Sequence, residues 1–147
     1  MIYLGTDHAG FNLKEVLKKY LSELGYEIKD LGNFVYDEAD DYPDWIGPCA
    51  EAVANDLKQG IDSRGIILGG SGQGEAIVAN KVSGIRATVL YNYNEDIIRL
   101  SRQHNNANVL SLGARFIDEE QAKKAVELWL ETDFPGDERH IRRIAKI

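Results

Sequence analysis

The sequence predicts an α/β fold: a three-layer αβα sandwich with a five-stranded parallel sheet and one additional helix at the C-terminus. Two observations predict it. Short apolar segments alternate along the whole chain with amphipathic segments of helical length, as successive right-handed βαβ units require. No linker, internal repeat or low-complexity stretch interrupts this alternation, so the 147 residues are expected to form one domain, 1–147.

The first part of the chain has two expected strands around one helix. IYLG at residues 2–5 is a short candidate for a buried strand. Residues 11–24 place apolar side chains near helical spacing, and Gly25 follows in the position where helices commonly end. YEIKDLG at 26–32 then predicts the second strand.

The middle part begins with an acidic, irregular stretch at 33–42. Pro43 then suits the first turn of a helix that extends to about Leu57. Residues 65–68 are apolar and predict the third strand, and an apolar helical pattern follows at 74–82.

The last part repeats the alternation and ends in a basic helix. Asp118 is expected to cap the last helix of the sandwich, with Gln121 as its reciprocal partner. The remaining strands are expected at 85–91 and 108–113, and the remaining helices at 94–104, 118–131 and 137–146. Ligands of such sheets bind at the carboxyl ends of the strands. The loops expected there are 5–10, 31–43, 69–74, 91–94 and 113–117.

Charge and composition argue against several classes of protein. The net charge of −7 is unfavourable for sequence-independent binding to nucleic acid. Polar residues follow the N-terminal methionine too soon for a secretory signal, and no apolar run approaches the roughly 18 residues that span a bilayer. The only cysteine, Cys49, cannot form an internal disulfide, so the cytoplasm is the expected compartment, with no membrane or nucleic-acid partner.

The stretch GIILGGSGQGEAIVAN at 65–80 holds the clearest sign of chemistry. Glycines stand at 69, 70, 72 and 74, where a strand is expected to turn into a helix. Such a loop can be a tight turn with no ligand, or it can bring backbone N–H groups close to an anion. The spacing fails the dinucleotide pattern G-x-G-x-x-G, and it fails the P-loop because Glu75 stands where the lysine belongs.

Glu75 decides which anion the glycine loop would hold. A carboxylate would repel a bound nucleotide phosphate, whereas it could move a proton for a smaller charge that develops beside it. An enediolate has this property, with its oxyanion on the amides of residues 70–74. The helix N-terminus favours the ionised form that a base requires. The alternative is that Glu75 is an ordinary acid in a first helical turn.

The three histidines differ in their surroundings. His8 stands beside Asp7 in GTDHAG, at the expected carboxyl end of the first strand. His104 precedes two asparagines, Asn105 among them, whose side chains can bind sugar hydroxyls. His140, in the basic tail, is expected to be a surface or satisfied residue. The chain has no histidine or cysteine pair at metal-ligand spacing, and Cys49 lies inside an expected helix, so neither a metal site nor a cysteine nucleophile is expected.

The C-terminal segment 139–147 is cationic. It holds four lysines and arginines and no acid, while the rest of the chain has a net charge of −11. Arg139 and Arg143 lie four residues apart and share a helix face, where they could clamp a phosphate or simply suit the end of a solvated helix. Arg115, after the last expected strand, could join such a clamp.

Together these motifs resemble the ribose-5-phosphate isomerase type B family, which includes the galactose-6-phosphate isomerase subunits. The matching blocks follow the expected order over the whole chain: GTDHAGFNLK at 5–14, DYPD at 41–44, GGSGQGEAIVANKVSGIRA at 69–87, RQHNNANVLSLGAR at 102–115 and RHIRRI at 139–144. The resemblance implies a Rossmann-like αβα sandwich, homodimers or tetramers whose active sites are shared between subunits, and no metal or nucleotide cofactor.

The resemblance also implies an activity, the interconversion of aldose and ketose sugar phosphates through a cis-enediolate. Many members use a cysteine at the end of the third strand as the proton shuttle. This chain has Gly69 there and is similar to the other branch, which uses the glutamate, here Glu75. Ser71 would assist ring opening or proton movement between the oxygens, and His104 would protonate the ring oxygen. Asp7, Tyr42 and Asn105 would contact the sugar. The amides that bind the enediolate would be those of Gly70, Gly72 and Gly74, and the phosphate would be held by His8, Arg115, Arg139 and Arg143.

The expected function is therefore the isomerisation of ribose 5-phosphate and ribulose 5-phosphate. The loss of the cysteine weakens any inference about the preferred sugar, so a six-carbon substrate such as allose 6-phosphate or galactose 6-phosphate stays open. A non-catalytic sugar-phosphate-binding protein is an alternative of another class. A nucleotide-binding module of the universal-stress type is weaker, because the glycine spacing is wrong for it.

Overall fold

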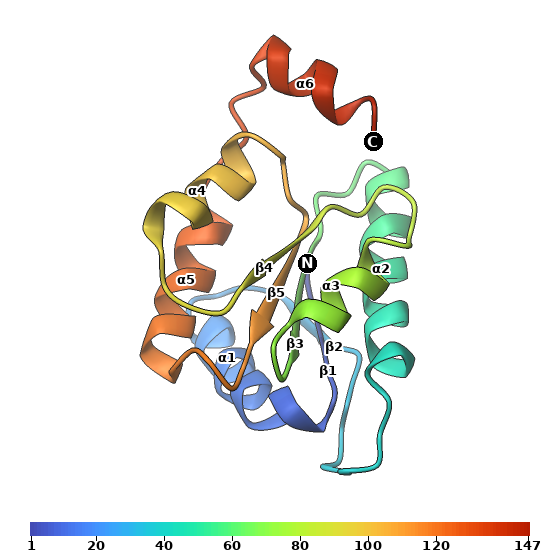
Figure 1. The fold of residues 1–147 in the computed structure, drawn as a ribbon, viewed down its shortest axis with the longest axis vertical. Helices are drawn as coiled ribbons and strands as arrows, with labels where there is room; N and C mark the ends of the chain where they lie inside the picture. Colours follow the sequence, from blue (N-terminus) through green and yellow to red (C-terminus); the bar gives the residue numbers. More distant parts are fainter.

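Five parallel strands form one sheet in the order β2-β1-β3-β5-β4 (Figure 1). The structure is a computed structural model that describes residues 1–147. The strands are β1 (Ile2–Thr6), β2 (Ile28–Asp30), β3 (Arg64–Gly69), β4 (Ala87–Leu90) and β5 (Val109–Gly113). This architecture confirms the predicted five-stranded αβα sandwich.

Helices cover both faces of the sheet, as βαβ units require. They are α1 (Phe11–Glu23), α2 (Tyr42–Lys58), α3 (Gln73–Ala79), α4 (Glu95–Gln103), α5 (Glu119–Glu131) and α6 (Glu138–Ile144), with a 3₁₀ turn, η1 (His8–Gly10), before α1. Apolar residues of α1, α4 and α5 form one core with one face of the sheet, and those of α2 and α3 form a second core on the other face.

The central strand β3 shows how the sheet serves both cores. Ile66 and Leu68 pack into the core with α1, α4 and α5, while Ile67 packs into the core with α2 and α3. Successive side chains of a strand point to opposite faces, so a strand buried on both sides reads as an unbroken apolar run. None of the helices is long and apolar enough to cross a membrane.

The element boundaries differ from the prediction only at their ends. The edge strand β2 and the edge strand β4 are shorter than expected, since each pairs with a single neighbour. Helix α3 ends at Ala79, three residues early, because the Asn80 side chain leaves the helix and exchanges two hydrogen bonds with the backbone of Ala87. Asp118 caps α5 as predicted, accepting the N–H of Gln121 at 2.8 Å, although no reciprocal bond from Gln121 joins it.

The parallel sheet gives the molecule two distinct edges. The loops that follow Thr6, Gly69 and Gly113 lie at the carboxyl edge, toward which the strand arrows in Figure 1 point. The turn between α4 and β5 lies at the opposite, amino edge. Helix α6 lies beyond that amino edge, outside the two layers that cover the sheet (Figure 1). Every candidate residue therefore belongs to one edge or the other.

Candidate functional site

The glycine loop at the carboxyl edge is shaped as an amide cradle. Gly72 has a φ of 75°, a left-handed conformation that favours glycine. A Cβ there would also lie 3.0 Å from the backbone of Leu112, so the loop packs directly on β5. The N–H groups of Gly70, Ser71 and Gly74 donate to no main-chain carbonyl, and neither does that of Gly72. Four main-chain donors of the loop are therefore free of main-chain partners.

The Glu75 carboxylate lies at the end of β3, directly over Gly69. A Cβ on Gly69 would overlap Oε1 and Cδ of Glu75. Glu75 is only 4% exposed. Burial raises the pKa of the Glu75 carboxyl, and the nearby charge of Asp7 raises this pKa further, against the opposing contact with its own backbone N–H. Burial thus opposes the ionised form, which the helix N-terminus was expected to favour.

Two further predicted residues flank the glycine loop. The Tyr42 ring lies against Gly74, where a Cβ would come within 2.9 Å of it. The Arg115 guanidinium lies over Gly70, 3.4 Å from the position of a Cβ. The hydroxyl of Ser71, an exposed residue, accepts only a long hydrogen bond, 3.3 Å from the N–H of Gln73.

A cavity of about 250 Å³ opens at the same edge, lined by Ser71, Gln73, Tyr91 and Phe116. Its walls come from the glycine loop and from the loops that follow β4 and β5. Phe116 is 64% exposed and Tyr91 is 50% exposed. The cavity is therefore lined by two polar residues, Ser71 and Gln73, and by two aromatic side chains that are half exposed or more.

Asp7 and His8 occupy the loop after β1, also at the carboxyl edge. Asp7 is buried, and one of its oxygens caps η1 by accepting the N–H of Ala9 at 2.9 Å. The His8 ring contacts Asp40, a residue that the sequence reasoning missed. The only signal for Asp40 was its place in the acidic stretch 33–42, which carries no regular pattern.

Ligand atoms of Asp7, His8 and Asp40 lie within 4.8 Å of one another, a spacing that a metal ion could use. The Asp40 carboxylate, however, already accepts four N–H bonds: two from His8, one from Asn33 and one from Trp45. A carboxylate has about four acceptor positions. Hydrogen bonds within the chain therefore account for this cluster.

The remaining predicted residues lie at the amino edge, away from Glu75. His104 ends α4, and Asn105 follows it in the turn before β5. Arg139 and Arg143 lie on α6 and are exposed. One chain therefore does not bring His104, Asn105, Arg139 or Arg143 together with the glycine loop.

His140 was expected to be exposed or to have its ring nitrogens hydrogen-bonded, and this expectation is wrong. The residue is 3% exposed, and its ring stacks on His104 with centroids 4.2 Å apart. Its Nε2 has no hydrogen-bond partner. Burial lowers the pKa of His140, and the neighbouring His104 lowers it further. Helix α6 is thus held to the end of α4 by this stack.

Two arginines hold the turn that carries His104 and Asn105. Arg86 donates to the carbonyls of Asn105 and Asn106, at 2.9 and 2.8 Å. Arg102 donates to the side chain of Asn106, whose φ of 45° is left-handed. The turn is therefore fixed from both sides.

Comparison with known proteins places this arrangement in a family. The sequence model of the Ribose/Galactose Isomerase family matches residues 2–147. The chain belongs to that family. Ribose-5-phosphate isomerase B of Mycolicibacterium paratuberculosis is 40% identical over 143 residues, which cover 97% of this chain and 86% of that protein.

Solved structures of the ribose/galactose isomerase family agree with the fold. The ribose-5-phosphate isomerase B of Clostridium thermocellum is 43% identical and superposes with a TM-score of 0.88, covering 99% of this chain and 93% of that one. The enzyme of Mycoplasma genitalium, solved with bound ribulose-5-phosphate, is 37% identical with a TM-score of 0.90, covering 99% and 91%. The family resemblance expected from the motifs is confirmed.

Proposed function

We propose that this chain is an aldose–ketose isomerase that interconverts ribose 5-phosphate and ribulose 5-phosphate through a cis-enediolate. Its place in the ribose/galactose isomerase family supports this function, as do the names of its relatives and the ribulose-5-phosphate in the Mycoplasma genitalium structure. One observation carries the mechanism: the buried Glu75 carboxylate lies beside main-chain N–H groups that bind no carbonyl.

Glu75 is the proposed proton shuttle. Its carboxylate takes the proton from C2 of the open-chain aldose, and the C2–H electron pair becomes the C1–C2 double bond while the carbonyl oxygen takes the negative charge. The N–H groups of Gly70, Ser71, Gly72 and Gly74 stabilise that oxyanion. A proton passes from the C2 hydroxyl to the C1 oxygen, a transfer that Ser71 is proposed to assist. The Glu75 carboxylic acid then returns its proton to C1 while C2 becomes the carbonyl, which completes the ketose. A pKa raised by burial suits a group that must both accept and release a proton.

A second copy of the chain is proposed to complete the site. The carboxyl edge holds Glu75, Ser71, Asp7, Tyr42, His8 and Arg115, and the remaining predicted residues lie at the amino edge. The proposed homodimer or tetramer sets the amino edge of one copy against the carboxyl edge of another. His104 and Asn105 then reach the sugar, with His104 protonating the ring oxygen, and Arg139 and Arg143 reach the phosphate.

The proposed reaction takes place in the cytoplasm and needs no metal or nucleotide cofactor. The only cysteine, Cys49, is fully buried, and burial raises its pKa to about 12, so it would not act as a nucleophile. Proton transfer by a carboxylate and charge stabilisation by amides supply the chemistry without a bound ion.

The test is a paired assay of turnover and hydrogen exchange. We expect the purified protein to convert ribose 5-phosphate to ribulose 5-phosphate and to exchange substrate hydrogen with solvent deuterium. Glu75→Gln should abolish both while leaving substrate binding largely intact, whereas Glu51→Gln, on the exposed face of α2, should change neither. Turnover retained by Glu75→Gln would reject the shuttle.

The same assay separates the alternatives. Faster turnover of allose 6-phosphate or galactose 6-phosphate than of ribose 5-phosphate would point to a six-carbon substrate. Binding without turnover of any sugar phosphate would favour a non-catalytic binding protein instead.

A further inference from the structure

One carboxylate, that of Asp40, holds the His8 side chain. Asp40 Oδ1 lies 2.6 Å from His8 Nδ1, and the same oxygen accepts the backbone N–H of His8 at 3.1 Å. The Asp40 side chain is 6% exposed and the His8 side chain 25% exposed. An ionised carboxylate only accepts hydrogen bonds, so Nδ1 carries a hydrogen here. His8 Nε2 makes no bond within the chain and is available to a ligand.

Asp40 is itself fixed by two other donors. Its Oδ2 accepts the Asn33 side-chain amide at 2.6 Å and the Trp45 indole N–H at 3.1 Å. Trp45 belongs to α2, whereas Asn33 belongs to the loop after β2. The carboxylate is therefore also anchored through its other oxygen, to α2 and to the loop after β2.

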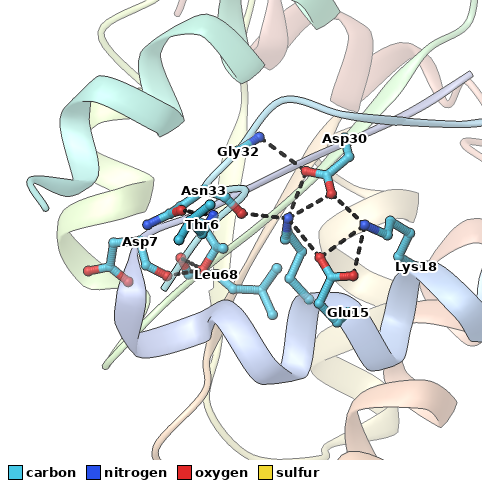
Figure 2. A network of polar contacts seen from close by, with 10 residues as sticks. Thr6, Asp7, Glu15, Lys18, Asp30, Gly32, Asn33 and Leu68 are labelled. Carbon is cyan, nitrogen blue, oxygen red and sulfur yellow. Dashed lines mark hydrogen bonds and ion pairs between the residues drawn. The ribbon is translucent and has the colours of Figure 1, made fainter. Parts of the chain in front are cut away.

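A buried lysine anchors the loop in turn. Lys14 is fully buried, and its Nζ donates to the Asn33 carbonyl at 2.8 Å and to both Asp30 oxygens at 2.8 and 2.7 Å (Figure 2). Buried charges are costly unless they are paired, so this lysine fixes the loop in one conformation. A continuous chain of contacts thus runs from Lys14 through Asn33 and Asp40 to His8.

The charges that face His8 come from several elements. Asp40 contacts the ring, Asp7 precedes it in the chain, Arg115 lies across from it after β5, and the Tyr36 ring meets it edge-on with centroids 6.4 Å apart. The hydrogen bond to Asp40 raises the pKa of His8; burial opposes this, Asp7 adds to it and Arg115 opposes it. For Asp40, burial acts to raise the pKa, but the His8 and Asn33 donors outweigh it and the pKa is lowered.

We propose that Asp40 is a positioning residue for the isomerisation. It holds His8 through Nδ1 and leaves Nε2 free, and its negative charge stabilises the cationic His8 ring that binds the substrate phosphate. This inference rests on the proposed function, since it needs His8 at the phosphate. Asp40 does not touch the substrate in this role. It acts through His8, so its removal should alter phosphate binding and leave proton transfer by Glu75 in place.

The experiment compares Asp40→Asn with Asp37→Asn, a matched control. Asp37 lies in the same loop, and its carboxylate accepts only the N–H of Ala39, so the control removes the same charge without touching His8. Two quantities are measured: the His8 pKa by NMR titration and KM for ribose 5-phosphate as a function of pH. The chain has only three histidines, so the His8 signal is assigned by its loss in His8→Ala.

We expect Asp40→Asn to lower the His8 pKa and Asp37→Asn to leave it unchanged. Above the ordinary histidine pKa of about 6.5, the ring should then carry less charge than in the native protein. KM should rise by up to about tenfold, the loss expected for one charge-assisted contact, with kcat changed less than about twofold. As the pH falls well below about 6.5, the ring becomes protonated in both proteins, so the two KM values should converge. The substrate phosphate also titrates in this pH range, but it does so equally for both proteins, so its effect cancels in the ratio of the two KM values.

An unchanged His8 pKa in Asp40→Asn would overturn the inference, and so would a KM ratio that does not vary with pH. Should Asp40→Asn fail to fold, Asp40→Glu replaces it, because it keeps the charge and moves the carboxylate by one methylene. It should keep the His8 pKa raised and increase KM at every pH, and an unchanged KM would refute the positioning role. Lack of any turnover by the unaltered protein would reject the proposed function. The NMR titration would still show whether Asp40 raises the pKa of His8.

Discussion

Replacing Gly69 by alanine tests where the Glu75 carboxylate acts. A Cβ on Gly69 would overlap Oε1 and Cδ of Glu75 and lie 2.6 Å from Oε2, whereas ordinary contacts begin at 3.4 Å. The carboxylate would have to move by at least about 0.8 Å to clear the new methyl group, and by more at the two overlapping atoms. A displacement of about 1 Å can lower a catalysed rate about 10²-fold, so we expect kcat to fall by that order with little change in KM.

The assay is steady-state isomerisation of ribose 5-phosphate, with hydrogen exchange as a second readout. Gly47→Ala is the control, because Gly47 lies in α2 and a Cβ there meets nothing within 4 Å. It should leave kcat unchanged and stabilise the protein slightly, by about 0.5–1 kcal/mol. Thermal melts of both variants show whether the folded state survives.

Wild-type kcat in a folded Gly69→Ala protein would refute the reasoning, since the carboxylate would then either lie elsewhere or not be the base. A double variant sharpens the test. Aspartate at position 75 is shorter by one methylene, so Glu75→Asp should cost less activity in the Gly69→Ala background than in the native one. Additive losses would contradict the steric coupling between the two positions.

Three further predictions follow from the same site. Burial raises the pKa of Glu75, so the ionised form destabilises the folded state at neutral pH. Glu75→Gln should therefore raise Tm near neutrality, with a gain that disappears as the pH falls below the ordinary value of 4.5; a gain that persists there would contradict the burial argument. Arg139→Ala should raise KM roughly tenfold with kcat retained, because phosphate contacts act equally on ground and transition states, and a fall in kcat alone would count against the clamp. Mixing inactive Glu75→Gln chains with inactive His104→Ala chains should restore activity, since some pairs contain one intact composite site; no recovery after verified exchange of subunits would refute the shared site.

The alternation of apolar and amphipathic segments was enough to predict the sheet and its helices. It succeeded for the central strands because a strand buried on both sides is apolar on both faces, as Ile66, Ile67 and Leu68 show. The cap at Asp118 was equally readable, because capping depends on side chains three residues apart. The length of α3 was not, because Asn80 ends it through a bond to Ala87, seven residues further along the chain.

The candidate site was only partly readable. The glycine loop and Glu75 were found because their residues are adjacent in the chain. His8 and Asp40 are 32 residues apart in the chain, and no local sequence pattern predicts their contact. The burial of Glu75 and of His140 depends in the same way on elements that meet only in the folded chain. The separation of His104 from Glu75 follows from topology alone, since His104 precedes a parallel strand while Glu75 follows one.

The placement of Glu75 and His104 at opposite edges of the sheet has a consequence for the behaviour of dilute solutions. If two copies share the site as proposed, a lone chain carries two halves of a site and no whole one, so dissociation would remove catalysis without unfolding the chain. By mass action, the rate per milligram should then decline as the protein is diluted below its dissociation constant. A two-fold arrangement would close on itself with two equal sites per pair, whereas a head-to-tail arrangement without closure would extend into filaments.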